Sequence, residues 1–129
     1  MRSSLLDLVV RVAVGDPLAG TPAIEWEPWH AATTVVAASG YPEAPTAGTV
    51  VHLPREPRDV HVFHAGTKLG AGDSLIAAGG RVLAVTAVGD TLAEAAQRSR
   101  DYARSVDLEG KQLRGDIGWR ELSRGARAS

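Results

Sequence analysis

The chain of 129 residues contains no cysteine, a single methionine and only 5% aromatic residues. The missing cysteine excludes a disulfide framework, a thiolate metal site and a cysteine nucleophile, and it is typical of a protein of the reducing cytoplasm. With so few aromatic rings, the core has to be mainly aliphatic. Hydrophobic residues make up 44% of the chain and charged residues 22%, which predicts one globular domain rather than a disordered chain.

An excess of one charge and a long apolar run are also missing. Lys and Arg total 14 against 15 for Asp and Glu, a formal net charge of -1, so neither nucleic acid nor an anionic membrane is expected as a partner. The longest apolar run, residues 5–14, is interrupted by Asp7 and Arg11 and is shorter than the roughly 18 residues of a membrane span. These charges, and the lack of a small-residue cleavage site after the run, argue against a signal peptide.

Two segments combine the apolar spacing of a helix with a start signal, residues 4–14 and residues 91–106. Each opens on a hydroxyl residue followed three positions later by an acidic one, a pattern that satisfies the free amides of a first helical turn. A third, short helix is expected over residues 117–122. Residues 123–129 are expected to form a frayed tail.

Five apolar segments bounded by glycine, proline or charged loops are predicted to be strands. They are residues 31–38, 49–53, 60–67, 75–78 and 81–87. In the first segment the apolar residues run on without strict alternation, so both of its faces are expected to be covered.

The Gly79-Gly80 pair separates the last two predicted strands and predicts a tight hairpin between them. In that register Ile76 faces Leu83, and Ala78 faces Arg81. The order of helix, several antiparallel strands and further helices favours an α+β fold of two layers, a mostly antiparallel sheet with flanking helices.

The histidines do not predict a metal site. They are His30, His52, His61 and His64. His61 and His64 lie three positions apart on a predicted strand, so they point to opposite faces and cannot hold one metal. The chain also lacks a nucleophile-elbow motif, and its Gly-Thr-Lys sequence lies between strands rather than opening a helix, unlike a nucleotide-binding loop. No residue of the chain is therefore assigned a catalytic role.

Two basic residues, Lys68 and Arg81, lie at the ends of neighbouring predicted strands beside glycines. Two cations next to accessible backbone amides could bind a phosphate or a carboxylate. They could instead be solvated turn residues, and spacing alone favours that interpretation. The basic residues of the second predicted helix are interpreted as a solvated face, and those after it make the C-terminus slightly basic. Together they are Arg98, Arg100, Arg104, Lys111, Arg114, Arg120, Arg124 and Arg127. A nucleic-acid patch at the C-terminus is the alternative, which the interleaved Asp116 and Glu121 disfavour.

Three ordered motifs carry a resemblance to a known family. They are VFHAGTKL at residues 62–69, GGRVLAVTAVGDTLAEA at residues 79–95 and DLEGKQLRGDIGWREL at residues 107–122. Together they resemble the C-terminal domain of phosphoribosylamine–glycine ligase, also called glycinamide ribonucleotide synthetase, over about residues 4–122. The sequence departs from the family pattern at Ser39 and in the loop 39–48 that it opens.

The resemblance implies a fold and a role. The family is of the ATP-grasp type and joins glycine to 5-phosphoribosylamine with hydrolysis of ATP to ADP and phosphate, in de novo purine biosynthesis. Its C-terminal domain, an antiparallel sheet resembling a rudiment single hybrid motif, closes the active site. By motif, Lys68 and Arg81 would bind the ribose phosphate. The supporting loop glycines would be Gly66, Gly79 and Gly80.

The resemblance also implies that most of the enzyme lies outside this sequence. Residues 1–17 resemble the end of the ATP-grasp part, and residues 18–122 resemble the C-terminal domain. ATP and Mg²⁺ would be bound by the ATP-grasp part, in cis or in trans, and the chain alone is expected to be inactive. The alternative is a stand-alone binding or interaction module without ligase activity. An apolar patch on the first helix is expected to be exposed and to promote self-association.

Overall fold

The structure is a computed structural model that describes residues 1–125, and it has the predicted α+β fold. The helical elements are α1 (Leu5–Val14), the 3-10 turn η1 (Ala71–Asp73), α2 (Leu92–Ser105) and α3 (Trp119–Gly125). The strands are β1 (His30–Ala37), β2 (Val60–His64), β3 (Thr67–Leu69), β4 (Leu75–Ala77), β5 (Arg81–Gly89) and β6 (Gln112–Leu113).

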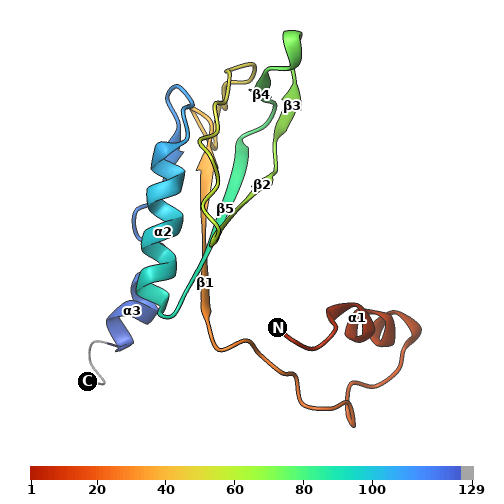
Figure 1. The fold of residues 1–129 in the computed structure, drawn as a ribbon. Coiled ribbons are helices and arrows are strands. Elements are labelled where there is room, and N and C mark those ends of the chain that lie inside the picture. Colours follow the sequence, from red (N-terminus) through yellow and green to blue (C-terminus); the bar gives the residue numbers. More distant parts are fainter. Residues whose placement is uncertain (126–129) are drawn as a thin grey trace.

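Four strands form the main sheet, in the order β2-β5-β1-β6, and all of its neighbouring strands are antiparallel. Helix α2 lies along one face of this sheet against β1 and β5 (Figure 1). Strands β3 and β4 form a separate two-stranded sheet that extends beyond the end of the main one.

Helix α2 begins where the sequence predicts, because Thr91 Oγ1 accepts a hydrogen bond from the Glu94 amide at 3.2 Å. Glu94 in turn accepts from the amide of Asp90 at 3.0 Å. The buried face of α2 is made mainly of small residues, which lets the helix backbone approach the sheet closely. Its buried residues are Ala95, Ala96, Ser99, Tyr102 and Ala103.

One buried hydroxyl pair connects α2 to the sheet. Ser99 Oγ lies 2.7 Å from Thr34 Oγ1 and 3.0 Å from the carbonyl oxygen of Val85. Ser99 and Thr34 are the polar side chains buried in the core of residues 1–125, and each satisfies the other. The contact therefore fixes the position of α2 relative to both β1 and β5 without leaving a buried polar group unpaired.

Strand β1 is covered on one face only, so the expectation that both faces are buried is wrong. Thr34 and Val36 are buried beneath α2, whereas Thr33 and Val35 are exposed. The opposite face of the main sheet is named here the open face. It carries Thr33 and Val35 of β1, His61 and Phe63 of β2, and Ala84 and Thr86 of β5. Ala and Thr are found at both buried and exposed positions. The run of these residues in β1 therefore does not reveal from the sequence that buried and exposed positions alternate along the strand.

The hairpin predicted across Gly79-Gly80 is also wrong. Strand β4 pairs with β3, so that Ile76 lies opposite Lys68 rather than a residue of β5. Strand β5 pairs instead with β1 and β2, and Arg81 lies opposite Ala37. The two glycines connect β4 of the two-stranded sheet to β5 of the main sheet. A tight turn would instead have paired β4 with β5.

Other boundaries differ from the sequence prediction in small ways. Residues 49–53 form isolated bridges rather than a strand, and the predicted strand 60–67 is divided into β2 and β3 by a break at residues 65–66. Helix α3 begins at Trp119, because Gly118 has a φ of 78° and belongs to the preceding turn. The expected frayed tail is helical to Gly125, and residues 126–129 lie outside the described residues.

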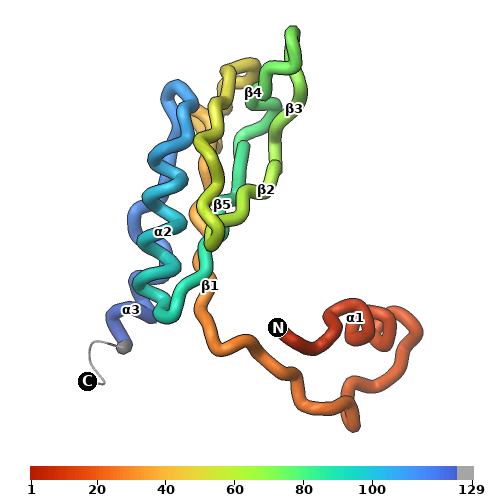
Figure 2. The backbone as a smooth tube through the Cα atoms, in the orientation of Figure 1, coloured from red at the N-terminus to blue at the C-terminus, as the bar shows by residue number. Residues whose placement is uncertain are grey.

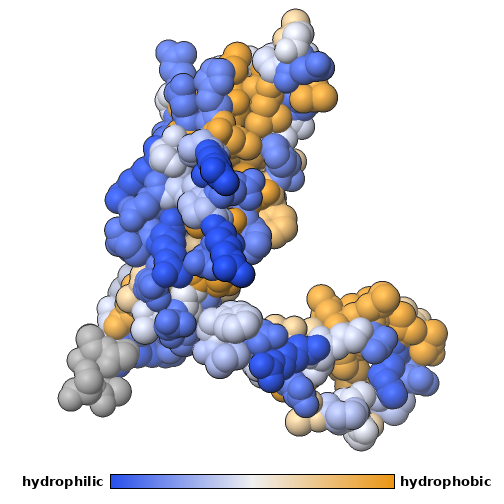
Figure 3. All heavy atoms as spheres, viewed as in Figure 1, coloured by the Kyte–Doolittle hydropathy of each residue, from blue (hydrophilic) through white to orange (hydrophobic). Residues whose placement is uncertain are grey.

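Helix α1 starts at its Ser4 cap, as predicted, and is set apart from the sheet (Figure 2). None of its residues is buried, and its apolar side chains form a hydrophobic surface in Figure 3. The exposed apolar residues are Leu5, Leu6, Val9, Val10, Val12 and Val14. The expected exposed patch is therefore present. Among residues 1–125, no helix combines the length and the apolar character needed to cross a bilayer.

We expect Ser99→Ala to lower the free energy of unfolding by about 1–3 kcal/mol, because it leaves the buried Thr34 hydroxyl without its partner. Adding Thr34→Val removes that hydroxyl, so the double variant should lose less than the sum of the two single variants. Urea unfolding of the four proteins measures the coupling, with the exposed Thr33→Val as control. Additive losses would contradict the buried pair.

We expect the isolated chain to self-associate through α1. Leu6 and Val9 are 70% and 53% exposed, and replacing both by glutamate should move the sedimentation equilibrium toward the monomer, because charged side chains would have to be desolvated in the contact. Phe63→Glu on the open face is the matched control. If Phe63→Glu rather than the α1 variant dissociates the assembly, the contact lies on the sheet.

Candidate functional site

Two of the three glycines predicted to support the site, Gly66 and Gly79, are in close backbone contact, and with the adjacent Gly80 they are named here the glycine junction (Gly66, Gly79 and Gly80). A Cβ atom on Gly66 would lie 2.6 Å from the carbonyl oxygen of Arg81 and 3.0 Å from the Cα atom of Gly79. The Gly66 amide donates to the carbonyl of Val82 at 3.1 Å, and the Ala78 amide donates to the carbonyl of Gly66 at 2.8 Å. Only glycine leaves room for this approach.

The side chain of Tyr41 covers the other side of the glycine junction. A Cβ atom on Gly80 would lie 2.6 Å from the Tyr41 ring atom Cδ2, so the ring rests directly on the Gly80 backbone. The Gly80 carbonyl also accepts from the amide of Ala38 at 2.9 Å. The turn before Arg81 is therefore held by backbone on one side and by an aromatic ring on the other.

Lys68 and Arg81 each lie within two positions of a glycine of this junction, on different strands. Lys68 is the central residue of β3, two positions after Gly66, and Arg81 is the first residue of β5. Both side chains are exposed. Arg81 lines a hollow at the end of β1, whereas Lys68 is not among the residues that line this hollow within residues 1–125.

The hollow beside Arg81, named here the Arg81 hollow, has a volume of about 440 Å³. Its position on the open face follows from Val35, an exposed residue of β1 that lines it. Its other lining residues are Ala37, Tyr41, Gln112, Leu113 and Arg114. The sequence gives no reason to place Tyr41, Gln112 or Arg114 beside Arg81. The third family motif contains Gln112 and Arg114, but its spacing gives no sign that they lie near Arg81.

Arg114 is held in one orientation by a nearby carboxylate. Its Nε atom donates to Asp116 Oδ1 at 2.9 Å, and its Nη2 atom donates to Asp116 Oδ2 at 2.7 Å. This bidentate hydrogen bond lowers the pKa of Asp116 and raises that of Arg114. At neutral pH the pair is therefore fully charged.

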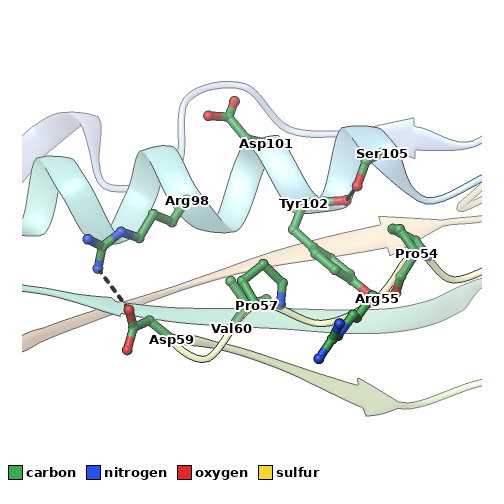
Figure 4. A pocket seen from close by; sticks show the side chains of 9 residues that line it. All are labelled: Pro54, Arg55, Pro57, Asp59, Val60, Arg98, Asp101, Tyr102 and Ser105. Carbon is green, nitrogen blue, oxygen red and sulfur yellow. Dashed lines mark hydrogen bonds and ion pairs between the residues drawn. The ribbon is translucent and has the colours of Figure 1, made fainter.

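A second hollow of about 400 Å³ lies between α2 and the loop before β2 (Figure 4). It is lined in part by Pro54, Pro57 and Tyr102, and the Tyr102 hydroxyl donates to the carbonyl of Pro54 at 2.7 Å. Burial, and next the charge of Glu56, raises the pKa of the Tyr102 hydroxyl. This hydrogen bond anchors the loop on α2, so the hollow is a consequence of packing on the helix side of the sheet.

The two strand histidines lie apart, as their spacing predicts. His61 is opposite Thr86 and His64 is opposite Leu83 on β5, and the ring of His64 makes a hydrogen bond of 2.9 Å with Thr67 Oγ1. Within residues 1–125, no group of three or more His, Asp or Glu side chains is arranged to hold a metal ion.

Comparison with known proteins shows the family. A family model described as phosphoribosylglycinamide synthetase, C domain, matches residues 31–120, from β1 to the start of α3. The chain belongs to this family. The first two motifs, the glycine junction and all but the last two residues of the third motif lie within the matched range, whereas α1 precedes it.

Relatives of this C domain are ligases. The chain is 41% identical over 127 residues to the phosphoribosylamine–glycine ligase of Yersinia pestis and 40% identical over 126 residues to that of Escherichia coli O157:H7. These matches cover 97% and 96% of the chain but only 29% of either relative. The crystal structure of phosphoribosylamine–glycine ligase from Thermotoga maritima matches 86% of the chain and 26% of its own, with a TM-score of 0.71 and 32% identity.

We expect Gly66→Ala to destabilise this C domain by about 1–3 kcal/mol, because the added methyl group would meet backbone atoms that cannot move without shifting β5. Gly115→Ala is the matched control, since nothing lies within 4 Å of its Cβ position. Urea unfolding gives the difference, and the backbone amide shift of Arg81 should change only in the Gly66 variant. Equal stabilities would contradict the glycine junction.

Proposed function

We propose that the chain is the C-terminal part of a phosphoribosylamine–glycine ligase, the enzyme that joins glycine to 5-phosphoribosylamine with hydrolysis of ATP in purine biosynthesis. The observation that supports the proposal is how much of the chain matches its relatives. Relatives named phosphoribosylamine–glycine ligase match 96–97% of the chain, and the chain spans less than a third of their length. In this proposal the chain contributes to a site that the rest of the ligase completes.

The proposed role of this domain is to close the active site and to hold the ribose phosphate through Lys68 and Arg81. A phosphate dianion favours charge-assisted hydrogen bonds to both an ammonium and a guanidinium group. Two features support the assignment. Both side chains are exposed and lie within two positions of a glycine of the junction, and neither makes an ion pair among the described residues, so their charges are available to a ligand.

The ligase reaction uses ATP with Mg²⁺, and the residues of this chain do not fit that group. Mg²⁺ bound with ATP takes carboxylate and phosphate oxygens as ligands, and residues 1–125 bring together no suitable acidic cluster. We therefore assign ATP and Mg²⁺ to the remainder of the ligase and no catalytic residue to this chain. The chain by itself should not release phosphate from ATP.

The proposal predicts complementation in trans. Adding the chain to a phosphoribosylamine–glycine ligase that lacks its own C-terminal domain should restore phosphoribosylamine-dependent formation of ADP. Lys68→Ala or Arg81→Ala should lower the restored kcat/KM for phosphoribosylamine about tenfold to a hundredfold, the effect of losing one charge-assisted hydrogen bond. ADP is measured by a coupled assay.

Arg55→Ala is the control for this assay, because Arg55 is exposed and lines the hollow on the helix side. It should leave the restored rate unchanged. No restoration at high concentration would count against a ligase role and favour a stand-alone binding module. If Lys68→Ala and Arg81→Ala restore the same kcat/KM as the unmodified chain, the result would count against the phosphate assignment alone.

A further inference from the structure

We propose that Arg114 is a second guanidinium of the substrate site, and that Arg81 and Arg114 bind the phosphate of a sugar phosphate together in the Arg81 hollow. This inference deepens the proposed function and depends on it for the class of substrate. It adds Arg114, which lies within the third family motif but to which the sequence assigns no binding role.

The topology of the sheet brings the two arginines to one place. Ala37 at the end of β1 lies opposite Arg81 of β5 on one side and opposite Gln112 of β6 on the other. Arg114 follows β6 directly. Neighbouring strands lie about 4.8 Å apart, so β5 and β6 are separated by about 10 Å across β1. Long side chains that reach inward from both sides can meet on a ligand between them, and both line the same hollow.

Arg114 retains donors for a ligand although it is paired with Asp116. A guanidinium group carries five N–H donors in one plane. Asp116 uses Nε and one hydrogen of Nη2, which leaves both hydrogens of Nη1 and the other hydrogen of Nη2. The carboxylate fixes the plane of the group, so the free edge is oriented before a ligand arrives and less entropy is lost on binding. Asp116 is thus a positioning residue.

The rest of the Arg81 hollow suits a sugar phosphate better than a bare anion. Tyr41, fixed on Gly80, offers an aromatic ring, and Gln112 offers an amide that can donate to or accept from a hydroxyl group. Val35 adds an exposed apolar side chain of the open face. The volume of about 440 Å³ leaves room for a pentose beside its phosphate.

Arg114 also lines a smaller hollow of about 100 Å³ on the helix side, together with Arg100 and Arg104. This arrangement offers an internal control. Arg104 is 64% exposed and lies 3.6 Å from Asp101, much as Arg114 is 74% exposed and pairs with Asp116. A general attraction of anions to the basic edge of the domain would require both arginines, whereas the Arg81 hollow requires only Arg114.

The test is a titration of the 129-residue chain with ribose 5-phosphate, followed by backbone and arginine side-chain NMR shifts. We expect saturable shifts at Tyr41, Arg81 and Arg114, and a rise in Kd of about tenfold or more for Arg114→Gln and for Arg81→Gln. Asp116→Asn should raise Kd less, about twofold to fivefold, because the guanidinium stays but is less well oriented. Arg104→Gln should bind as the unmodified chain does.

The outcomes separate this inference from the proposed function. An unchanged Kd in Arg114→Gln, with weaker binding in Arg81→Gln, overturns the role of Arg114 and leaves the ligase proposal in place. Equal losses in Arg114→Gln and Arg104→Gln, or shifts centred on Arg100, overturn it in favour of a general basic edge. Absence of saturable binding overturns the hollow as a site, while complementation still decides the ligase role. Arg114→Lys keeps the charge and serves if Arg114→Gln disturbs the fold.

Discussion

The backbone contact at Gly66 constrains the rest of the structure. No side chain fits between Gly66 and the segment that leads into β5, so the chain can leave the main sheet after β2, build the β3–β4 sheet and return within a few ångströms of its point of departure. The same contact fixes the first residue of β5, Arg81, because Gly66 donates to the neighbouring carbonyl of Val82. The backbone of Arg81 is thereby fixed at a strand end, where a side chain starts from a better defined position than on a free loop.

The elements that depend on local signals could be predicted from the sequence. Both long helices start at capping residues that make the expected hydrogen bonds, Ser4 for α1 and Thr91 for α2. The Gly79-Gly80 turn could not be predicted correctly, because a glycine pair satisfies both a local hairpin and a close approach from a distant strand. The close contact of Gly66 with Gly79 and Arg81 excludes the hairpin. Strand β6, with two residues, is too short to leave a periodic pattern.

The candidate site shows the same division. Lys68 and Arg81 could be selected by motif, since they end the short recognisable sequences Gly-Thr-Lys and Gly-Gly-Arg. Tyr41 and Arg114 could not, because they approach Arg81 only through the pairing of β1 with β5 and β6, across about forty and thirty residues of chain. Thr34 illustrates the same limit in the core, since its burial depends on Ser99, which lies on a helix far along the sequence.

The two arginines of the Arg81 hollow differ in what they can contribute. Arg81 makes no ion pair within residues 1–125, so its full charge is available, but its side chain has no fixed partner to orient it. Arg114 has a fixed plane, but Asp116 offsets its charge and would repel a phosphate that approached from that side. A phosphate held between them would gain attraction chiefly from Arg81 and direction chiefly from Arg114. Such a site binds only a ligand that reaches both, which favours a substrate seated in the hollow over an anion at the surface.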